Sequence, residues 1–109
     1  MTWKIATSAD GRLTVAFAGA LDAASGLASA LAFAQALGDE SRNVVFDIRE
    51  MKGYESGARI AWQQTIGPKR KQLLSLVVVG GRPLVKVGAS TLALFLRIPH
   101  RFVADPKEI

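Results

Sequence analysis

Hydrophobic and polar residues near the N-terminus alternate with a period of two, which is the pattern of a strand with one buried face. Residues Trp3–Ser8 alternate weakly, an Asp-Gly turn signal follows, and Arg12–Ala18 alternates clearly. The two segments therefore predict an antiparallel hairpin.

The period changes to three or four residues after Asp22, which is a good helix N-cap. This spacing predicts a helix that ends at Gly38. Gly26 lies inside it, and close packing against a sheet would explain a residue of such low helix propensity. The expected inner face consists of small and apolar residues: Ala24, Leu27, Ala28, Leu31 and Ala34.

The middle of the chain combines a continuous apolar segment with an amphipathic one. Asn43–Ile48 is interrupted only by Asp47 and predicts a central strand that is covered on both faces. A polar loop should follow, and then a helix over Ser56–Ile66 with Arg59 and Gln63 on its outer face. Its expected inner residues are Ala58, Ala61, Trp62, Thr65 and Ile66.

The last part of the chain repeats the order of strand, loop and helix. Leu73–Val79 predicts a buried strand, and a loop, Gly80–Pro83, separates it from a helix over Leu84–Leu96. The inner face of this helix is expected to comprise Val85, Gly88, Ala89, Leu92, Phe95 and Leu96. His100–Val103 fits a short edge strand, and the tail after it is expected to fray.

The predicted order is β-β-α-β-α-β-α-(β), in one domain that covers residues 1–109. Such an order predicts an α/β fold with a mixed sheet of four or five strands and helices packed on it. Half of the residues are hydrophobic, which excludes general disorder.

Composition narrows the chemistry that this domain can perform. The chain has no cysteine and one histidine, His100, so we expect no metal site and no cofactor. No apolar run approaches the ~20 residues that span a bilayer. The N-terminus also lacks the apolar core of a signal peptide, so a cytoplasmic protein is expected.

Charge is distributed unevenly around a net value of +5. No Asp or Glu occurs between Ser56 and Ala104, whereas this stretch contains Arg59, Lys69, Arg70, Lys71, Arg82, Lys86, Arg97 and Arg101. Such a surface attracts acidic proteins or phosphate groups, or simply keeps the protein soluble. Four residues are candidates for anion binding: Lys69, Arg70, Lys71 and Arg82. The aromatic residues are expected mostly inside, so we expect no nucleic-acid partner.

Several short motifs follow one another at characteristic distances. The strand and turn Phe17–Asp22 (FAGALD) precede an apolar strand with an internal Asp, Val44–Ile48 (VVFDI). A turn that opens a helix follows at Tyr54–Gly57 (YESG), and Leu76–Gly80 (LVVVG) leads to the helix over Leu84–Leu96. In this order and spacing the motifs resemble the STAS domain, the family of bacterial anti-sigma-factor antagonists, from about Leu13 to Val103.

The resemblance implies a regulatory role in partner switching, with a protein partner such as an anti-sigma factor or a kinase-like protein. In this family a kinase phosphorylates the serine before the glycine of the turn, and the modified form releases its partner. That serine is Ser56 here, and the implied partner-binding residues are Asp47, Tyr54, Glu55, Ser56, Gly57, Arg59 and Gln63. Tyr54-Glu55 departs from the family pattern of an acidic residue followed by Ser or Thr.

Alternatives remain open at this stage. Ser56 fits a plain helix N-cap, and Asp47 fits an anchor that accepts loop N–H groups or holds Ser56. A more distant set of proteins, compared with the lipid-binding Sec14 group, has the same fold without phosphorylation, so a nucleotide- or lipid-binding domain is the second hypothesis. Enzymatic activity is not expected, because nothing brings His100 close to Ser56 and Asp47 as a catalytic triad requires.

Overall fold

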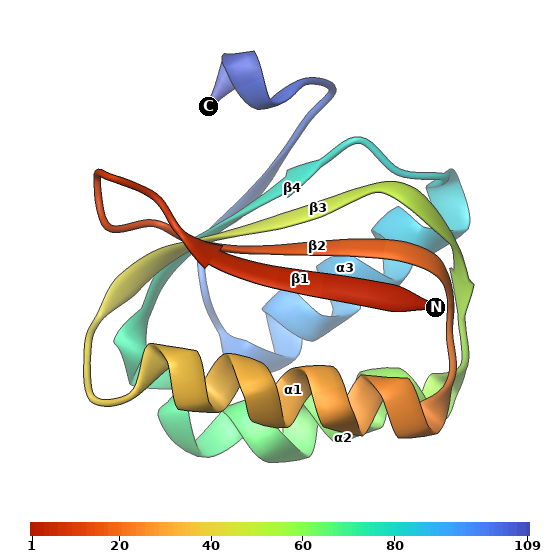
Figure 1. Cartoon of the computed structure of the whole chain (residues 1–109), viewed down its shortest axis with the longest axis horizontal. Coiled ribbons are helices and arrows are strands. Elements are labelled where there is room, and N and C mark those ends of the chain that lie inside the picture. Colours follow the sequence, from red (N-terminus) through yellow and green to blue (C-terminus); the bar gives the residue numbers. More distant parts are fainter.

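A single five-stranded sheet with three helices forms the core of the molecule, in a computed structural model that describes all 109 residues (Figure 1). The strands are β1 (Thr2–Thr7), β2 (Leu13–Leu21), β3 (Arg42–Tyr54), β4 (Leu73–Val79) and β5 (His100–Val103). The helices are α1 (Ala23–Leu37), α2 (Ser56–Ile66) and α3 (Pro83–Leu96), with short 3-10 helices η1 (Gly67–Gln72) and η2 (Pro106–Glu108).

The strands lie in the order β1-β2-β3-β4-β5. β1 pairs with β2 in antiparallel fashion, and the other neighbours pair in parallel through helical crossovers. The predicted hairpin, central strand, edge strand and mixed α/β sheet are therefore confirmed.

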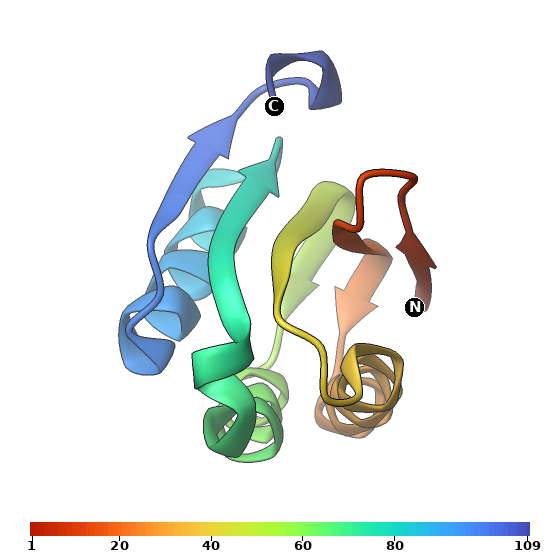
Figure 2. The same cartoon turned by 90° about the vertical axis from the view of Figure 1, so that its left-hand side faces the viewer.

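All three helices pack on one face of the sheet, so the expectation that the central strand is covered on both faces is wrong: no helix covers its other face (Figures 1 and 2). Figures 1 and 2 show α1 and α2 side by side below the sheet and α3 beside β4 and β5. Alternate residues of β3 point to opposite faces, so Phe46 and Ile48 join the core under the helices, whereas Val45 packs in a smaller cluster on the other face. None of the helices is long and apolar enough to cross a membrane.

The centre of the core is an aromatic cluster with one internal polar contact. The rings of Phe17, Phe33, Phe46 and Trp62 lie with centroids between 5.2 and 6.5 Å apart, mostly edge to face. The Trp62 indole N–H donates to the buried Ser29 hydroxyl at 3.0 Å, and that hydroxyl donates to the Gly26 carbonyl at 3.0 Å. The polar atoms of the cluster are thus satisfied inside the core.

The predicted inner face of α1 is wrong. Leu27 and Leu31 are 47% and 55% exposed. The buried residues of α1 are Gly26, Ser29, Ala30, Phe33 and Leu37. Gly26 packs against α2 rather than the sheet, because a Cβ atom added there would lie 2.5 Å from the Cα of Ala58. Since α1 is apolar on both faces, its spacing alone does not indicate which face is buried.

Three further differences concern segments outside the predicted elements. β3 does not give way to a loop after Ile48 but continues to Tyr54, because its second half pairs with β2 across two register shifts. η1 replaces the expected loop after α2, and η2 with its Asp105 and Glu108 capping box replaces a frayed tail.

The buried residues of α2 agree with expectation, whereas its expected outer residues and one position in α3 do not, and Arg59 lines an internal cavity. Ala58, Trp62 and Ile66 are buried in α2, and its other expected inner residues are half-buried, as are Arg59 and Gln63. In α3, however, Phe95 is 55% exposed, and Ala93 is buried instead.

Candidate functional site

Ser56 is the first residue of α2, directly after β3 and its boundary residue Glu55. The N-cap position belongs to Glu55, whose backbone is extended (φ −89°, ψ 149°) and whose side chain makes no bond to α2. The interpretation of Ser56 as the N-cap is therefore wrong. Its side chain is exposed, and its hydroxyl makes no hydrogen bond within the chain.

The N-termini of α1 and α2 meet beside Ser56. The Glu55 backbone N–H donates to the Leu21 carbonyl at 2.9 Å, and the Glu55 carboxylate accepts the Ala23 N–H at 2.9 Å. Glu55 therefore caps α1 and not its own helix. Gly57 permits this approach, because a Cβ atom there would lie 2.9 Å from the Cβ of Ala23.

Asp22 completes the cap of α1, as its sequence position predicts. Its carboxylate accepts the Ser25 N–H at 2.7 Å, and this hydrogen bond lowers the pKa of Asp22. Two carboxylates, from Asp22 and Glu55, thus accept N–H groups at the electropositive N-terminus of α1, and Glu55 directly precedes Ser56 in the chain.

Tyr54 connects this site to α3. A Cβ atom added to Gly88 would lie 2.5 Å from the Tyr54 ring, so the ring rests directly on the α3 backbone. No local sequence signal indicates this contact, because it joins residues that are distant in the chain.

A small apolar cavity lies beside Tyr54, between α2, α3 and the sheet. Arg59 is one of the residues that line the cavity, and most of the others are hydrophobic, among them Phe46, Trp62 and Leu92. Its volume is about 50 Å³, whereas small-molecule sites usually measure ~300–1,000 Å³. In this conformation the cavity encloses neither a nucleotide nor a lipid.

Asp47 points to the face of the sheet that has no helices. Its carboxylate accepts hydrogen bonds from the Arg49 guanidinium at 2.7 and 3.0 Å and from the Arg49 backbone N–H at 3.2 Å. These bonds lower the pKa of Asp47 and raise that of Arg49. Asp47 is thus a local anchor and does not hold Ser56. Strand parity was the available signal, because Asp47 alternates with the inward Phe46 and Ile48.

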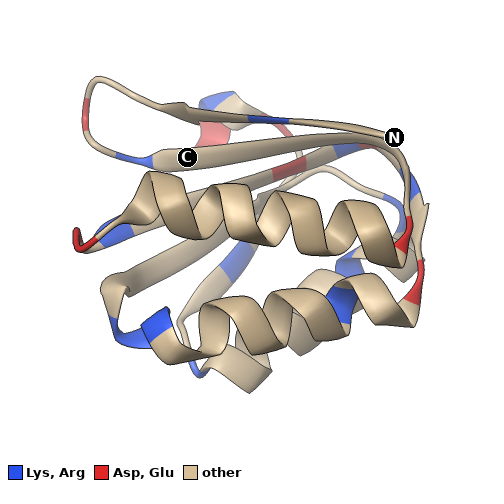
Figure 3. Cartoon of the chain, turned by 60° about the horizontal axis from the view of Figure 1, so that its bottom comes forward, with Lys and Arg blue, Asp and Glu red and all other residues tan.

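The four candidate anion-binding residues do not converge. The Lys69 ammonium donates to the Gly38 carbonyl at 2.8 Å and so ties η1 to the end of α1, and Lys71 is exposed. Arg70 lies beside Phe95 at the end of α3, and Arg82 precedes the other end of that helix. The Gly80 N–H, in the loop before Arg82, donates to the Val103 carbonyl at 2.8 Å. Figure 3 shows these cations spread around α2 and α3, while α1 carries no charge along its length.

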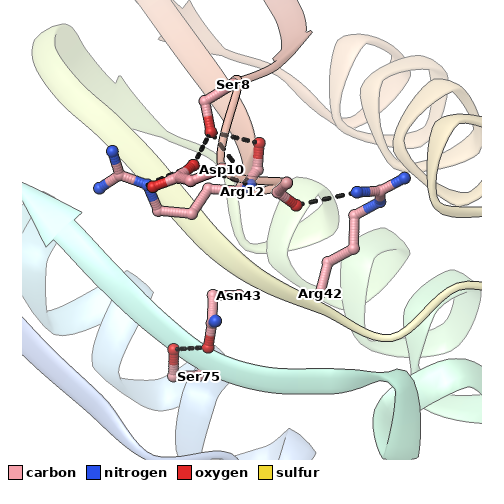
Figure 4. A network of polar contacts seen from close by, with 7 residues as sticks. Ser8, Asp10, Arg12, Arg42, Asn43 and Ser75 are labelled. Atoms are coloured by element: carbon pink, nitrogen blue, oxygen red, sulfur yellow. Dashed lines mark hydrogen bonds and ion pairs between the residues drawn. The ribbon is translucent and has the colours of Figure 1, made fainter.

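Sequence reasoning missed a polar network at the opposite end of the central strand (Figure 4). Asp10 forms an ion pair with Arg12 at 2.9 Å, and its hydrogen bond from Ser8 lowers the pKa of Asp10. The Arg42 guanidinium donates to the Gly11 carbonyl at 2.9 Å. Nearby, Ser75 donates to the Asn43 side chain at 2.7 Å. The contacts of Asp10 and Arg42 hold the β1–β2 turn, although the buried Arg42 Nε has no hydrogen-bond partner.

His100 contacts Ser90 rather than Ser56. The Ser90 hydroxyl and the His100 Nε2 lie 3.2 Å apart, and no carboxylate hydrogen-bonds to this pair. A Ser-His pair without an acid to orient the imidazole lacks the third component of a catalytic triad.

Comparison with solved structures identifies relatives of this fold. An uncharacterized protein of the DUF3478 family with a SpoIIAA-like fold, from Shewanella loihica PV-4, is 18% identical with a TM-score of 0.74, over 98% of this chain and 88% of that one. The anti-sigma factor antagonist SpoIIAA in its unphosphorylated form is 9% identical with a TM-score of 0.67, over 98% of this chain and 92% of that one. No family model and no curated protein matches the sequence. The chain therefore has a SpoIIAA-like fold.

Proposed function

We propose that this protein is a non-enzymatic regulatory module of a bacterial partner-switching pathway, similar to the anti-sigma-factor antagonists, and that it acts in the cytoplasm. The observation that carries the proposal is the exposed Ser56 hydroxyl, which opens α2 in a SpoIIAA-like fold and has no partner within the chain. The proposed partner is an anti-sigma factor or a kinase-like protein that docks around Tyr54, Ser56 and the outer side of α2.

Phosphorylation of Ser56 would change this surface strongly. A phosphate adds nearly two negative charges directly after Glu55, whose carboxylate together with that of Asp22 already caps α1. Arg59 lies three residues further along α2, within reach of a phosphate on Ser56. Repulsion from the carboxylates and recruitment of Arg59 would both remove contacts that a partner makes with the unmodified site.

The test is a comparison of partners captured by the wild type and by charge variants. The full chain, Ser56→Ala and Ser56→Asp are immobilised and exposed to lysate of the native cell, and bound proteins are quantified by mass spectrometry. We expect a regulatory partner to bind the wild type and Ser56→Ala, and to bind Ser56→Asp at least about tenfold more weakly, equivalent to ~1.4 kcal/mol.

Ser41→Asp is the matched control. Ser41 is also exposed, but it precedes the other end of β3, so the same added charge there should leave binding unchanged. Equal retention of the partner by Ser56→Asp and the wild type would contradict the switch. Incubation of the wild type with lysate and ATP should also yield a phosphopeptide at Ser56 that is absent from Ser56→Ala.

A further inference from the structure

The outer side of α3 carries a row of exposed hydrophobic residues. Leu84, Val87, Leu94 and Phe95 are 71%, 58%, 67% and 55% exposed. Thr91 lies among them, and its hydroxyl donates to the Val87 carbonyl at 2.8 Å, so its polar atom is satisfied within the helix. These five residues form the α3 stripe.

The opposite side of α3 is buried as well as apolar. Val85, Ala89, Leu92 and Leu96 pack into the core beneath the sheet. A helix that is hydrophobic on both sides is normally buried on both sides. Because Leu84 and Leu94 remain exposed, the α3 stripe has the character of an interaction surface.

The stripe has the spacing of a helix-packing seam. Leu84, Val87, Thr91 and Leu94 recur at intervals of three, four and three residues, which are the a and d positions of a heptad repeat. They extend over about 15 Å of helix, or three turns. This periodicity suits a second helix lying alongside α3, whereas a lipid surface would not require it.

Cations lie at both ends of α3 and on the segments packed beside it. Lys86 and Arg97 belong to α3 itself and its C-terminal end, and Arg82 precedes it. Arg59 of α2 lines the cavity with Val85 and Gly88, and Arg70 of η1 lies in a surface depression with Phe95 and Arg97. These cations, Arg59, Arg70, Arg82, Lys86 and Arg97, form the basic rim.

The basic rim is not neutralised within the chain. The ion pairs of the structure are Asp10–Arg12 and Asp47–Arg49, both away from α3. Two copies of the chain that met through their stripes would bring like charges together, which disfavours self-association. An acidic partner would instead be attracted electrostatically by every cation of the basic rim.

We infer that the α3 stripe and the basic rim bind an acidic amphipathic helix of a partner protein. Apolar residues of that helix pack on Leu84, Val87 and Leu94, while its flanking carboxylates face the rim. This surface lies beyond the proposed switch at Ser56 and shares only Arg59 with it, and the stripe itself does not depend on phosphorylation.

A pair of synthetic helical peptides provides the probe. The acidic peptide has Leu at each a and d position and Glu at the flanking positions, and the control peptide has Lys in place of every Glu. Fluorescence anisotropy with the full chain should show saturable binding of the acidic peptide that weakens as salt is added. The Lys peptide should bind at least about tenfold more weakly.

Variants of the protein separate the stripe from general hydrophobicity. Leu94→Glu should weaken binding of the acidic peptide by at least about tenfold, and Lys86→Glu should weaken it and reduce its salt dependence. Leu31→Glu is the matched control, since Leu31 is 55% exposed on α1, and it should bind like the wild type. Circular dichroism confirms that each variant is folded.

Several results would overturn the inference. They are absence of saturable binding, equal binding of the two peptides, and equal losses in Leu94→Glu and Leu31→Glu. Binding to phosphatidylglycerol vesicles but not to the acidic peptide would assign the surface to a membrane. Self-association that Leu94→Glu abolishes would assign it to a second copy. Ser56 is unchanged in all these variants, so failure here is distinct from failure of the switch.

Discussion

At the scale of the residue, hydrogen bonds to individual carboxylate groups stabilise the junction of α1 and α2. Asp22 accepts a backbone N–H from its own helix, whereas Glu55 reaches across 32 positions of the chain to accept the Ala23 N–H. The first contact could be predicted, because Asp before an apolar helical pattern is a good N-cap. The second could not, because it requires β2 and β3 to end side by side.

Replacement of Asp22 by Asn should reduce the acid sensitivity of the fold. The folded-state pKa of Asp22 lies below its ordinary value of 3.8, so its stabilising effect is present above about pH 4 and is lost as the pH falls through the folded-state pKa. Asn keeps the capping acceptor but does not titrate. The free energy of unfolding of Asp22→Asn, measured in urea from pH 6 to pH 2, should therefore fall less steeply than that of the wild type. Parallel curves would contradict this assignment.

At the scale of the element, close packing of α2 determines which face of α1 is buried. Gly26 of α1 lets the Cα of Ala58 approach, and the Ser29–Trp62 hydrogen bond joins the same two helices. The charge-free sequence of α1 permits either of its faces to be buried. Phe33 and Ser29 face the aromatic core in the fold because α2 brings Trp62 to that side.

Gly26→Ala should destabilise the protein although alanine favours helices. A new Cβ atom would lie 2.5 Å from backbone, which has little room to move, so we expect a net loss of about 1–3 kcal/mol in the free energy of unfolding. Urea denaturation provides the measurement. Gly53→Ala is the control, because a Cβ atom there meets nothing within 4 Å. Equal stability of Gly26→Ala and the wild type would show that the helices separate more easily than inferred.

At the scale of the whole molecule, the arrangement of the sheet and the helices determines where a ligand or a partner could bind. The helices enclose a tightly filled core on one face of the sheet, and the apolar cavity between α2, α3 and the sheet measures only about 50 Å³. The cations surround α2 and α3 without converging on one point. This architecture offers surfaces to protein partners rather than an enclosed pocket to a small molecule.

The protein purified from its native cell should therefore carry no nucleotide or lipid. Native mass spectrometry should show the mass of the bare polypeptide, because the cavity has room for little more than one or two water molecules. A denaturing spectrum of the same sample gives the reference mass. An additional mass that disappears on denaturation would favour the ligand-binding hypothesis over the regulatory one.

The sequence by itself determined which elements form and in what order. Leu73–Val79 and Ser56–Ile66 are present with the predicted bounds, because the hydrophobic period and the Gly67-Pro68 signal act locally. Only the tertiary structure decided which face of α1 is buried and that β3 continues past Ile48. These outcomes depend on contacts between distant segments. The local pattern is compatible with either helix face being buried and with more than one strand length, and packing and strand pairing select between them.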